Sequence, residues 1–169
     1  NTWDVTLVTD MSKLFKDMPL FNAPIDQWDT SQVTNMSRMF NDATSFNQPL
    51  TFNTAQVTSM RYMFAGARAF NQPLTFTDTS QVTTMRGMFH GATAFNQPLT
   101  FDTSKVTDMR YMFSGAIAFN QPLTFTDTRK VTDMGYMFQG ATAFNQPLTF
   151  DTSQVTEMNS MFADARAFN

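Results

Sequence analysis

The chain repeats one pattern every 24 or 25 residues, and this periodicity constrains its fold more than any other feature. A Val-Thr pair marks each of seven units, beginning at Val8, Val33, Val57, Val82, Val106, Val131 and Val155. The spacings alternate strictly between 25 and 24 residues. A unit this short cannot bury an apolar face by itself, so we expect successive units to stack and share one continuous core.

The alternation in length has a single source. The segments Phe-Thr-Asp-Thr at 76–79 and 125–128 are one residue longer than the equivalent Phe-Asp-Thr segments at 101–103 and 150–152. The sequence therefore also repeats at 49 residues, which indicates duplication of a two-unit segment. We expect the extra residue to form a bulge or a longer corner on every second unit.

The apolar residues change their spacing within each unit. From Val106 to Phe119 they follow a helical period, whereas Leu123 and Phe125 stand two residues apart, as in a strand. We therefore predict an α/β fold, a right-handed solenoid of seven repeats, each a short helix followed by a short parallel strand.

The predicted helix covers about 108–114 and has plausible ends. Thr107 is expected to cap its N-terminus, and a left-handed residue is expected just after its C-terminus. The column at that place holds Gly66, Gly91, Gly115 and Gly140, with Asp17, Asp42 and Asp164 in the remaining units. Both residue types tolerate the left-handed conformation better than most.

We expect one repeat array over residues 1–169. Residues 1–28 form a capping-type unit in this interpretation, because Trp3 and Trp28 depart from the common pattern, and residues 29–169 form regular repeats. The last unit keeps the ordinary apolar pattern and stops within the repeated phrase. We therefore expect the array to be truncated at its C-terminus.

Composition excludes several classes of protein. The chain contains no cysteine, which excludes a disulfide framework, and 14 acids against 11 bases give a net charge of -3. Such a balance argues against nucleic acid as the main partner, because phosphate binding needs a basic surplus. No apolar run reaches the length of about 18 residues that a membrane span needs. With a single histidine and no metal-spaced motif, we expect no enzyme, no cofactor and no bound metal.

Two phrases, Trp28-Asp-Thr-Ser-Gln-Val-Thr-Asn-Met-Ser-Arg-Met-Phe40 and Phe46-Asn-Gln-Pro-Leu50, resemble the repeat of BspA-like bacterial surface proteins. The resemblance recurs in every unit and covers the whole chain. It implies a leucine-rich-repeat-like solenoid on an extracellular or cell-surface protein, often a lipoprotein or an adhesin. The function it implies is non-catalytic recognition or adhesion, with a protein or a glycan at a cell surface as partner.

Variable positions of the predicted helix form the first candidate binding face. These positions hold Arg61, Tyr62, Arg86, Arg110, Tyr111 and Tyr136. Arg and Tyr are enriched at protein interfaces, so this face is a candidate partner site. The alternative is that it is an ordinary solvated helix face.

An invariant row of threonines forms the second candidate face. Its members are Thr51, Thr75, Thr100, Thr124 and Thr149. On stacked strands their hydroxyls would recur every ~4.8 Å, a spacing that could match a periodic ligand such as ice or a polysaccharide. The alternatives are that threonine simply suits an exposed strand position and that the array is a purely structural spacer.

Two further polar columns are better explained by structure than by ligand binding. An asparagine is the second residue of each Phe-Asn-Gln-Pro-Leu phrase, as at Asn96 and Asn120, and we expect these amides to bond the backbone of adjacent units. An aspartate column including Asp78, Asp102 and Asp127 could hold calcium, but one acid per unit gives few ligands. We therefore expect these acids to form Asx turns.

Overall fold

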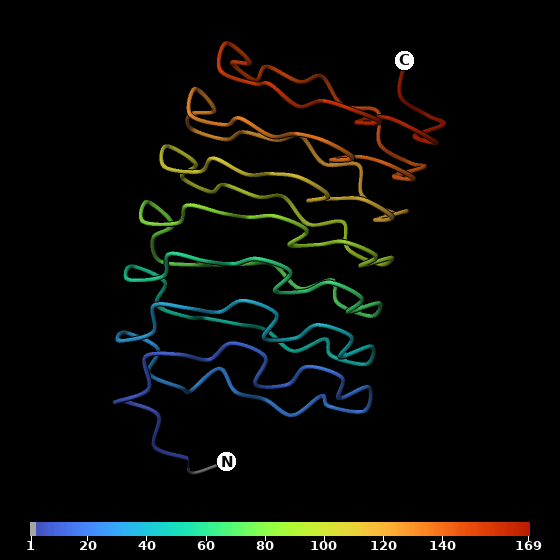
Figure 1. Cartoon of the computed structure of the whole chain (residues 1–169). Helices are drawn as coiled ribbons and strands as arrows, with labels where there is room; N and C mark the ends of the chain where they lie inside the picture. The colour runs from blue at the N-terminus through green and yellow to red at the C-terminus, as the bar shows by residue number, and fades with distance from the viewer. Residues whose placement is uncertain (1–2) are drawn as a thin grey trace.

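A computed structural model describes residues 3–169; residues 1 and 2, which belong to the expected capping unit 1–28, lie outside the described part. Figure 1 shows the repeats lying one above another, from the N-terminus at the bottom to the C-terminus at the top. We number them repeat 1 to repeat 7 in chain order, with bounds 8–32, 33–56, 57–81, 82–105, 106–130, 131–154 and 155–169.

Residues 3–169 contain no helix and no strand longer than an isolated bridge, so there are no helix or strand bounds to give. The predicted α/β fold, a right-handed leucine-rich-repeat-like solenoid with a helix and a parallel strand in each repeat, is therefore wrong. Each repeat consists instead of turns and short extended stretches that bond to the neighbouring repeats. Over this same range no helix has the length and apolarity needed to cross a membrane.

The segment 108–114, predicted to be a helix, is a run of turns. Its N–H groups alternate between two kinds of partner. Some bond the carbonyl three residues earlier, and the others leave the repeat, as when the Phe113 N–H donates to the Met137 carbonyl at 2.8 Å. In addition, Tyr111 and Gly115 adopt φ values of +60° and +70°. An α-helix requires right-handed dihedrals and bonds to the carbonyl four residues earlier, so neither requirement is met.

Two left-handed residues, four positions apart, occur in every repeat. The second column is the predicted one: Asp17, Asp42, Gly66, Gly91, Gly115, Gly140 and Asp164 all have positive φ. The first column was not predicted and holds Lys13, Arg38, Tyr62, Gly87, Tyr111, Tyr136 and Ser160. The predicted left-handed conformation is thus confirmed, but it closes a turn and not a helix.

Thr107 does not cap a helix. Its N–H and its Oγ1 both donate to the Thr83 carbonyl of the preceding repeat, at 3.0 and 3.4 Å. Equivalent threonines repeat this bond along the whole array, from Thr34 to Thr156. The recurring hydroxyl of this column therefore holds adjacent repeats together.

The repeats are aligned in parallel. One continuous series of bridges joins Asp10, Asn35, Ser59, Thr84, Asp108, Asp133 and Glu157. A second series is interrupted: Leu50 pairs with Leu74 and Leu99 with Leu123, whereas no bridge joins Leu74 to Leu99. The missing bridge falls where the longer repeat inserts its extra residue at 76–79, so the insertion breaks the register at every second repeat.

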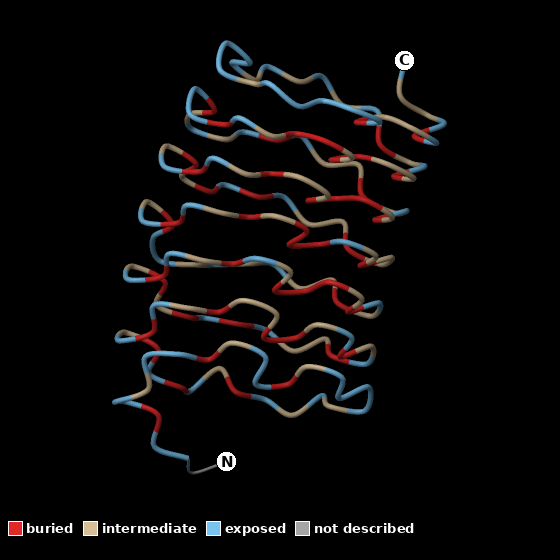
Figure 2. Cartoon of the chain, viewed as in Figure 1, coloured by how far each residue is buried: buried red, intermediate tan, exposed pale blue. Residues whose placement is uncertain are grey.

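Phenylalanine rings stacked along the array are most of the largest buried side chains of the core, which also contains methionine, valine and alanine. One column has neighbouring centroids 5.4–5.7 Å apart and includes Phe89, Phe113 and Phe138. A second column, including Phe95 and Phe119, has spacings of 5.7–6.0 Å. Within each repeat the two rings lie 3.8–4.2 Å apart. Figure 2 shows buried segments at equivalent places in successive repeats, as a shared core requires.

Candidate functional site

Arginine and tyrosine side chains from successive repeats form a connected group on the surface, which we call the Arg–Tyr face. It consists of Arg38, Arg61, Tyr62, Arg86, Arg110, Tyr111 and Tyr136. All six residues of the first predicted face thus come together, and Arg38 joins them. The group lies on the run of turns and not on a helix.

Arg110 occupies the centre of the C-terminal half of the Arg–Tyr face. Its Cζ lies 5.1 Å from the centroid of Tyr111 and 5.4 Å from that of Tyr136. The two tyrosine rings stack on each other with centroids 4.8 Å apart. Contacts between a guanidinium and aromatic faces are attractive and restrict the side chains, so this part of the face is preorganised.

Arg86 connects the two halves of the face. Its Nε donates to the Tyr62 hydroxyl at 3.4 Å, and its Cζ lies 6.0 Å from the centroid of Tyr111. Two acids lie close by: the Asp108 carboxylate is 3.9 Å from Arg86, and the Asp133 carboxylate is 3.8 Å from Arg110. Burial raises the pKa of Asp108, and the nearby Arg86 guanidinium acts in the opposite direction.

A hollow of about 260 Å³ opens in the N-terminal half of the face. It is lined by Arg38, Asn41, Arg61, Tyr62, Ala65 and His90. Among residues 3–169 no carboxylate forms an ion pair with either of its two arginines. Sequence reasoning included neither Arg38 nor His90 in a candidate site. The available signal was that Arg38 occupies the same repeat position as Tyr62.

All members of the predicted threonine row, Thr51, Thr75, Thr100, Thr124 and Thr149, are exposed, as expected. Their environments differ, however. The Thr51 Oγ1 donates to the Asp26 carbonyl at 3.0 Å, and the Thr75 Oγ1 donates to the Leu50 carbonyl at 3.4 Å. Thr100 and Thr149 instead line two hollows between repeats. All five threonines of the row are therefore exposed, but the groups around them differ from repeat to repeat.

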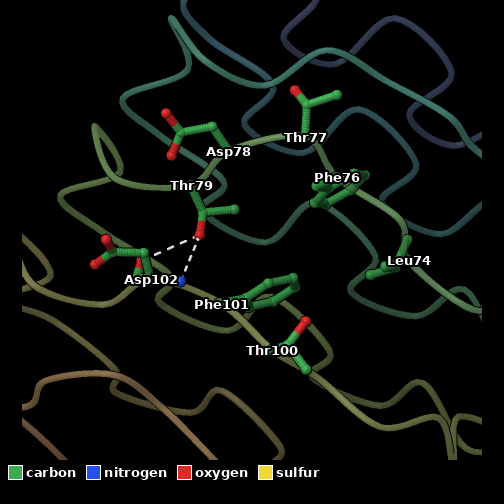
Figure 3. Close-up of a pocket in the computed structure, with 8 residues that line it drawn as sticks. All are labelled: Leu74, Phe76, Thr77, Asp78, Thr79, Thr100, Phe101 and Asp102. Atoms are coloured by element: carbon green, nitrogen blue, oxygen red, sulfur yellow. Dashed lines mark hydrogen bonds between the residues drawn. The ribbon is translucent and has the colours of Figure 1, made fainter.

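We call these two cavities the corner hollows. The first, of about 170 Å³, is shown in Figure 3 and is lined by Leu74, Phe76, Thr77, Asp78, Thr79, Thr100, Phe101 and Asp102. The second, of about 190 Å³, is lined by Leu123, Phe125, Thr126, Asp127, Thr128, Arg129, Thr149, Phe150 and Asp151. The second corresponds to the first at the 49-residue period. Each lies where the extra residue interrupts the leucine bridges, so the insertion accounts for both.

Hydroxyls and carboxylates dominate the corner hollows. In the first, the Thr79 Oγ1 donates to the Asp102 carbonyl at 3.1 Å and accepts from the Asp102 N–H at 2.8 Å (Figure 3). Hydrogen bonding from Ser104 lowers the pKa of Asp102. In the second, the Arg129 side chain lowers the pKa of Asp127 to about 2. These carboxylates are therefore ionised at neutral pH and can accept hydrogen bonds from a ligand.

The asparagine and aspartate columns have the structural roles predicted for them. The Asn120 N–H donates to the Asn96 Oδ1 at 2.9 Å, and the same bond recurs between neighbouring repeats from Asn22 to Asn169. The Ser104 N–H donates to the Asp102 Oδ1 at 2.8 Å, as an Asx turn requires. No group of three or more metal-ligating side chains is found within the described residues.

Comparison with known proteins gives one result. The sequence matches a family described as Mycoplasma protein of unknown function, DUF285, over residues 1–101 and again over 73–169. Neither a curated protein nor a solved structure matches the chain. The two matched segments together span the whole sequence, so the chain belongs to the DUF285 family.

Proposed function

We propose that this chain is a non-catalytic recognition or adhesion module and that it contacts its partner through the Arg–Tyr face. The observation that carries the proposal is the guanidinium–tyrosine network that runs along the array. The resemblance to BspA-like surface-protein repeats supports an extracellular or cell-surface location. Belonging to the DUF285 family is compatible with this location but does not specify a ligand.

The composition of the face favours recognition. Tyr and Arg supply large contact areas and are the residues most often found at interface hot spots. Here Arg110 already lies against both Tyr111 and Tyr136, so less side-chain entropy remains to be lost on binding. The face also changes along the array, since Gly87 replaces the tyrosine in repeat 4. A surface that differs between repeats can bind a partner in one register.

The test is a binding screen of the purified chain against immobilised extracellular-matrix proteins and glycans. We expect the double variant Arg110→Gln with Tyr111→Gly to weaken any binding found by at least about tenfold. Glycine is chosen because Tyr111 has a positive φ and because Gly87 occupies the same repeat position. The control is Thr100→Tyr with Thr124→Tyr, which alters the threonine row and should retain binding. Equal binding by all variants would contradict a role for the Arg–Tyr face.

The corner hollows favour a second candidate function, the binding of a periodic polysaccharide. Two equivalent hollows recur at every second repeat, about 9.6 Å apart at ~4.8 Å per repeat. Each combines ionised carboxylates and threonine hydroxyls with the edge of a half-buried phenylalanine, Phe76 or Phe125. In an extended β-linked glycan alternate sugar rings present the same face, so two such rings can meet the same chemistry. Weak contacts at two equivalent sites add through multivalency.

The threonine row supplies a matched test of this second function. Neutral β-linked glucose oligosaccharides of increasing length are titrated against Thr100→Tyr, Thr149→Tyr and Thr124→Tyr. The first two substitutions obstruct one hollow each, whereas Thr124 lies in the same row and lines neither hollow. We expect Thr100→Tyr and Thr149→Tyr to remove the gain in affinity with chain length, and Thr124→Tyr to preserve it. Equal losses from all three would assign binding to the row, and not to the hollows.

A further inference from the structure

We propose that the hollow between Arg38 and Arg61 binds the acidic group of a saccharide, a carboxylate or a sulfate on a single sugar ring. The inference rests on the proposed function, because it names the ligand class for the N-terminal half of the Arg–Tyr face. It depends on three observations: two arginines without a carboxylate partner, their fixed position against Tyr62, and a cavity of mixed polarity.

The two arginines of the hollow form no close ion pair among the described residues, and the charge of Arg61 acts on Asp108 only at longer range. Arg86 and Arg110 each lie within 4 Å of a carboxylate, at Asp108 and Asp133. Arg38 and Arg61 have no such partner in the part of the chain that the structure describes. A guanidinium presents a planar fork of N–H donors that suits a carboxylate or a sulfate.

Tyr62 contacts both arginines and restricts their positions. The Cζ of Arg38 lies 5.6 Å from the centroid of the Tyr62 ring, and that of Arg61 lies 5.4 Å from it. The ring itself is held by Gly87, over which it lies, and by Arg86, which donates to its hydroxyl. The two guanidinium groups are therefore placed before a ligand arrives, and binding loses little side-chain entropy.

The remaining lining suits a sugar ring. Tyr62 and Ala65 contribute apolar surface, while His90 and Asn41 contribute polar atoms. Both hydrogens of the Asn41 amide are used, by the Ala65 carbonyl at 3.0 Å and the Asp42 carboxylate at 2.8 Å. Its amide oxygen is left to accept from a ligand hydroxyl. A small cavity with apolar walls and a few directed polar groups is typical of small-molecule sites.

Other anionic partners fit less well. A nucleic acid presents a long row of phosphates and binds through an extended basic surface, whereas this chain has a net charge of -3 and the hollow presents two arginines. An acidic peptide side chain would satisfy the arginines but would give His90 and the Asn41 amide oxygen no ligand group to bond. The acidic saccharide is the class that uses the whole lining.

The experiment is a calorimetric and NMR titration of the full chain with methyl β-glucuronide and with a methyl glucoside sulfate. Methyl β-glucoside serves as the neutral control ligand. An N-acetyl-glutamate amide serves as the control for an acidic peptide side chain. We expect binding of one or both acidic sugars, with shifts of the Tyr62 and His90 resonances. The neutral sugar should bind at least about tenfold more weakly, because it lacks the charge-assisted bonds. Equal binding of the glutamate amide would overturn the saccharide assignment.

The variants Arg38→Gln and Arg61→Gln should each weaken binding of the acidic sugar by about tenfold or more. Arg68→Gln removes the same charge from an exposed residue outside the hollow and should leave binding unchanged. Equal losses of affinity in all three variants would show that only the net charge of the chain matters and would overturn the proposal. Failure of the proposed function would give a different result. In that case the acidic sugar would still bind, but the double variant Arg110→Gln with Tyr111→Gly would capture partners as well as the parent chain. Only the recognition role of the wider face would then be contradicted.

Discussion

The ring of Tyr62 lies directly over Gly87 in the next repeat: a Cβ added to Gly87 would come within 2.1 Å of the Tyr62 Cε1. Both residues are left-handed, with φ of +54° and +59°. The single glycine in this column therefore makes room for the tyrosine below it. That tyrosine in turn positions the two arginines of the hollow.

Gly87→Ala is expected to destabilise the chain by about 1–3 kcal/mol, since it combines strain at positive φ with a collision against a ring. Urea unfolding measures the effect. Gly91→Ala is the control, because Gly91 also has a positive φ but its nearest non-neighbouring atoms lie 3.9 Å or more from an added Cβ. Tyr62→Gly should restore part of the loss at Gly87. Equal costs at Gly87 and Gly91 would contradict the packing described.

Phe113→Ala should lower the free energy of unfolding by about 3–5 kcal/mol. The Phe113 ring is fully buried and stacks on Phe89, Phe119 and Phe138 at 5.7, 4.2 and 5.5 Å. Thr124→Ala, at an exposed site, should change the free energy by no more than about 0.5 kcal/mol. Chemical denaturation of the two variants checks the pair, and similar losses would mean that the buried and exposed sides are misassigned.

The asparagine ladder should contribute to stability one bond at a time. Asn96→Ala removes the acceptor for the Asn120 N–H and for the Gln121 Nε2, which lie 2.9 and 3.2 Å from the Asn96 Oδ1. Loss of an acceptor from a half-buried donor should cost about 1–3 kcal/mol. Asn96→Asp keeps an oxygen in place and should cost less. The ladder would have no energetic role if Asn96→Ala unfolded at the same urea concentration as the parent chain.

Acid should destabilise the chain through its Asx-turn carboxylates. The pKa of Asp127 is lowered from 3.8 to about 2 by its hydrogen bonds with Arg129. At a pH between these two pKa values the unfolded state binds more protons than the folded state. The stabilisation that Asp127 contributes is therefore fully present above about pH 4 and is lost as the pH drops toward 2. Asp127→Asn should reduce this dependence, which unfolding measured between pH 2 and 6 would reveal. An unchanged slope would exclude Asp127 as a contributor.

The sequence was sufficient to predict the shared core and the polar ladders, because both follow from identical residues recurring at one period. Phe113 is buried and Asn96 bonds the next repeat, as their columns required. The left-handed conformation of Gly115 was also predictable, since only glycine and aspartate occupy that column. Each of these features depends on the residue type at a single position.

The local conformation could not be predicted in the same way. Apolar residues at the spacing of Val106, Met109, Met112 and Phe113 fit a helix, but they fit a run of turns equally well. What decides between them is that alternate N–H groups bond the next repeat, and such long-range bonds leave no local pattern. One sequence feature indicated the left-handed conformation of Tyr111: Gly87 occupies the same column.

The candidate site, too, was only partly predictable from the sequence. The six arginines and tyrosines of the first face were found because of their residue types, whereas the hollow depends on Arg38 and His90, which come from different repeats. The extra residue at 76–79 and 125–128 predicted an altered corner. That it would leave two equivalent cavities required the register of the leucine bridges.

The central claim is that alternate N–H groups of residues 109–115 bond the next repeat and that this segment is not a helix, since this arrangement builds both the Arg–Tyr face and the stack. Scalar couplings across hydrogen bonds, measured by NMR, identify the acceptor of each N–H. The Phe113 N–H should couple to the Met137 carbonyl, 2.8 Å away in the next repeat. Coupling of the Phe113 N–H to the Met109 carbonyl, four residues earlier, would show an α-helix and contradict the account.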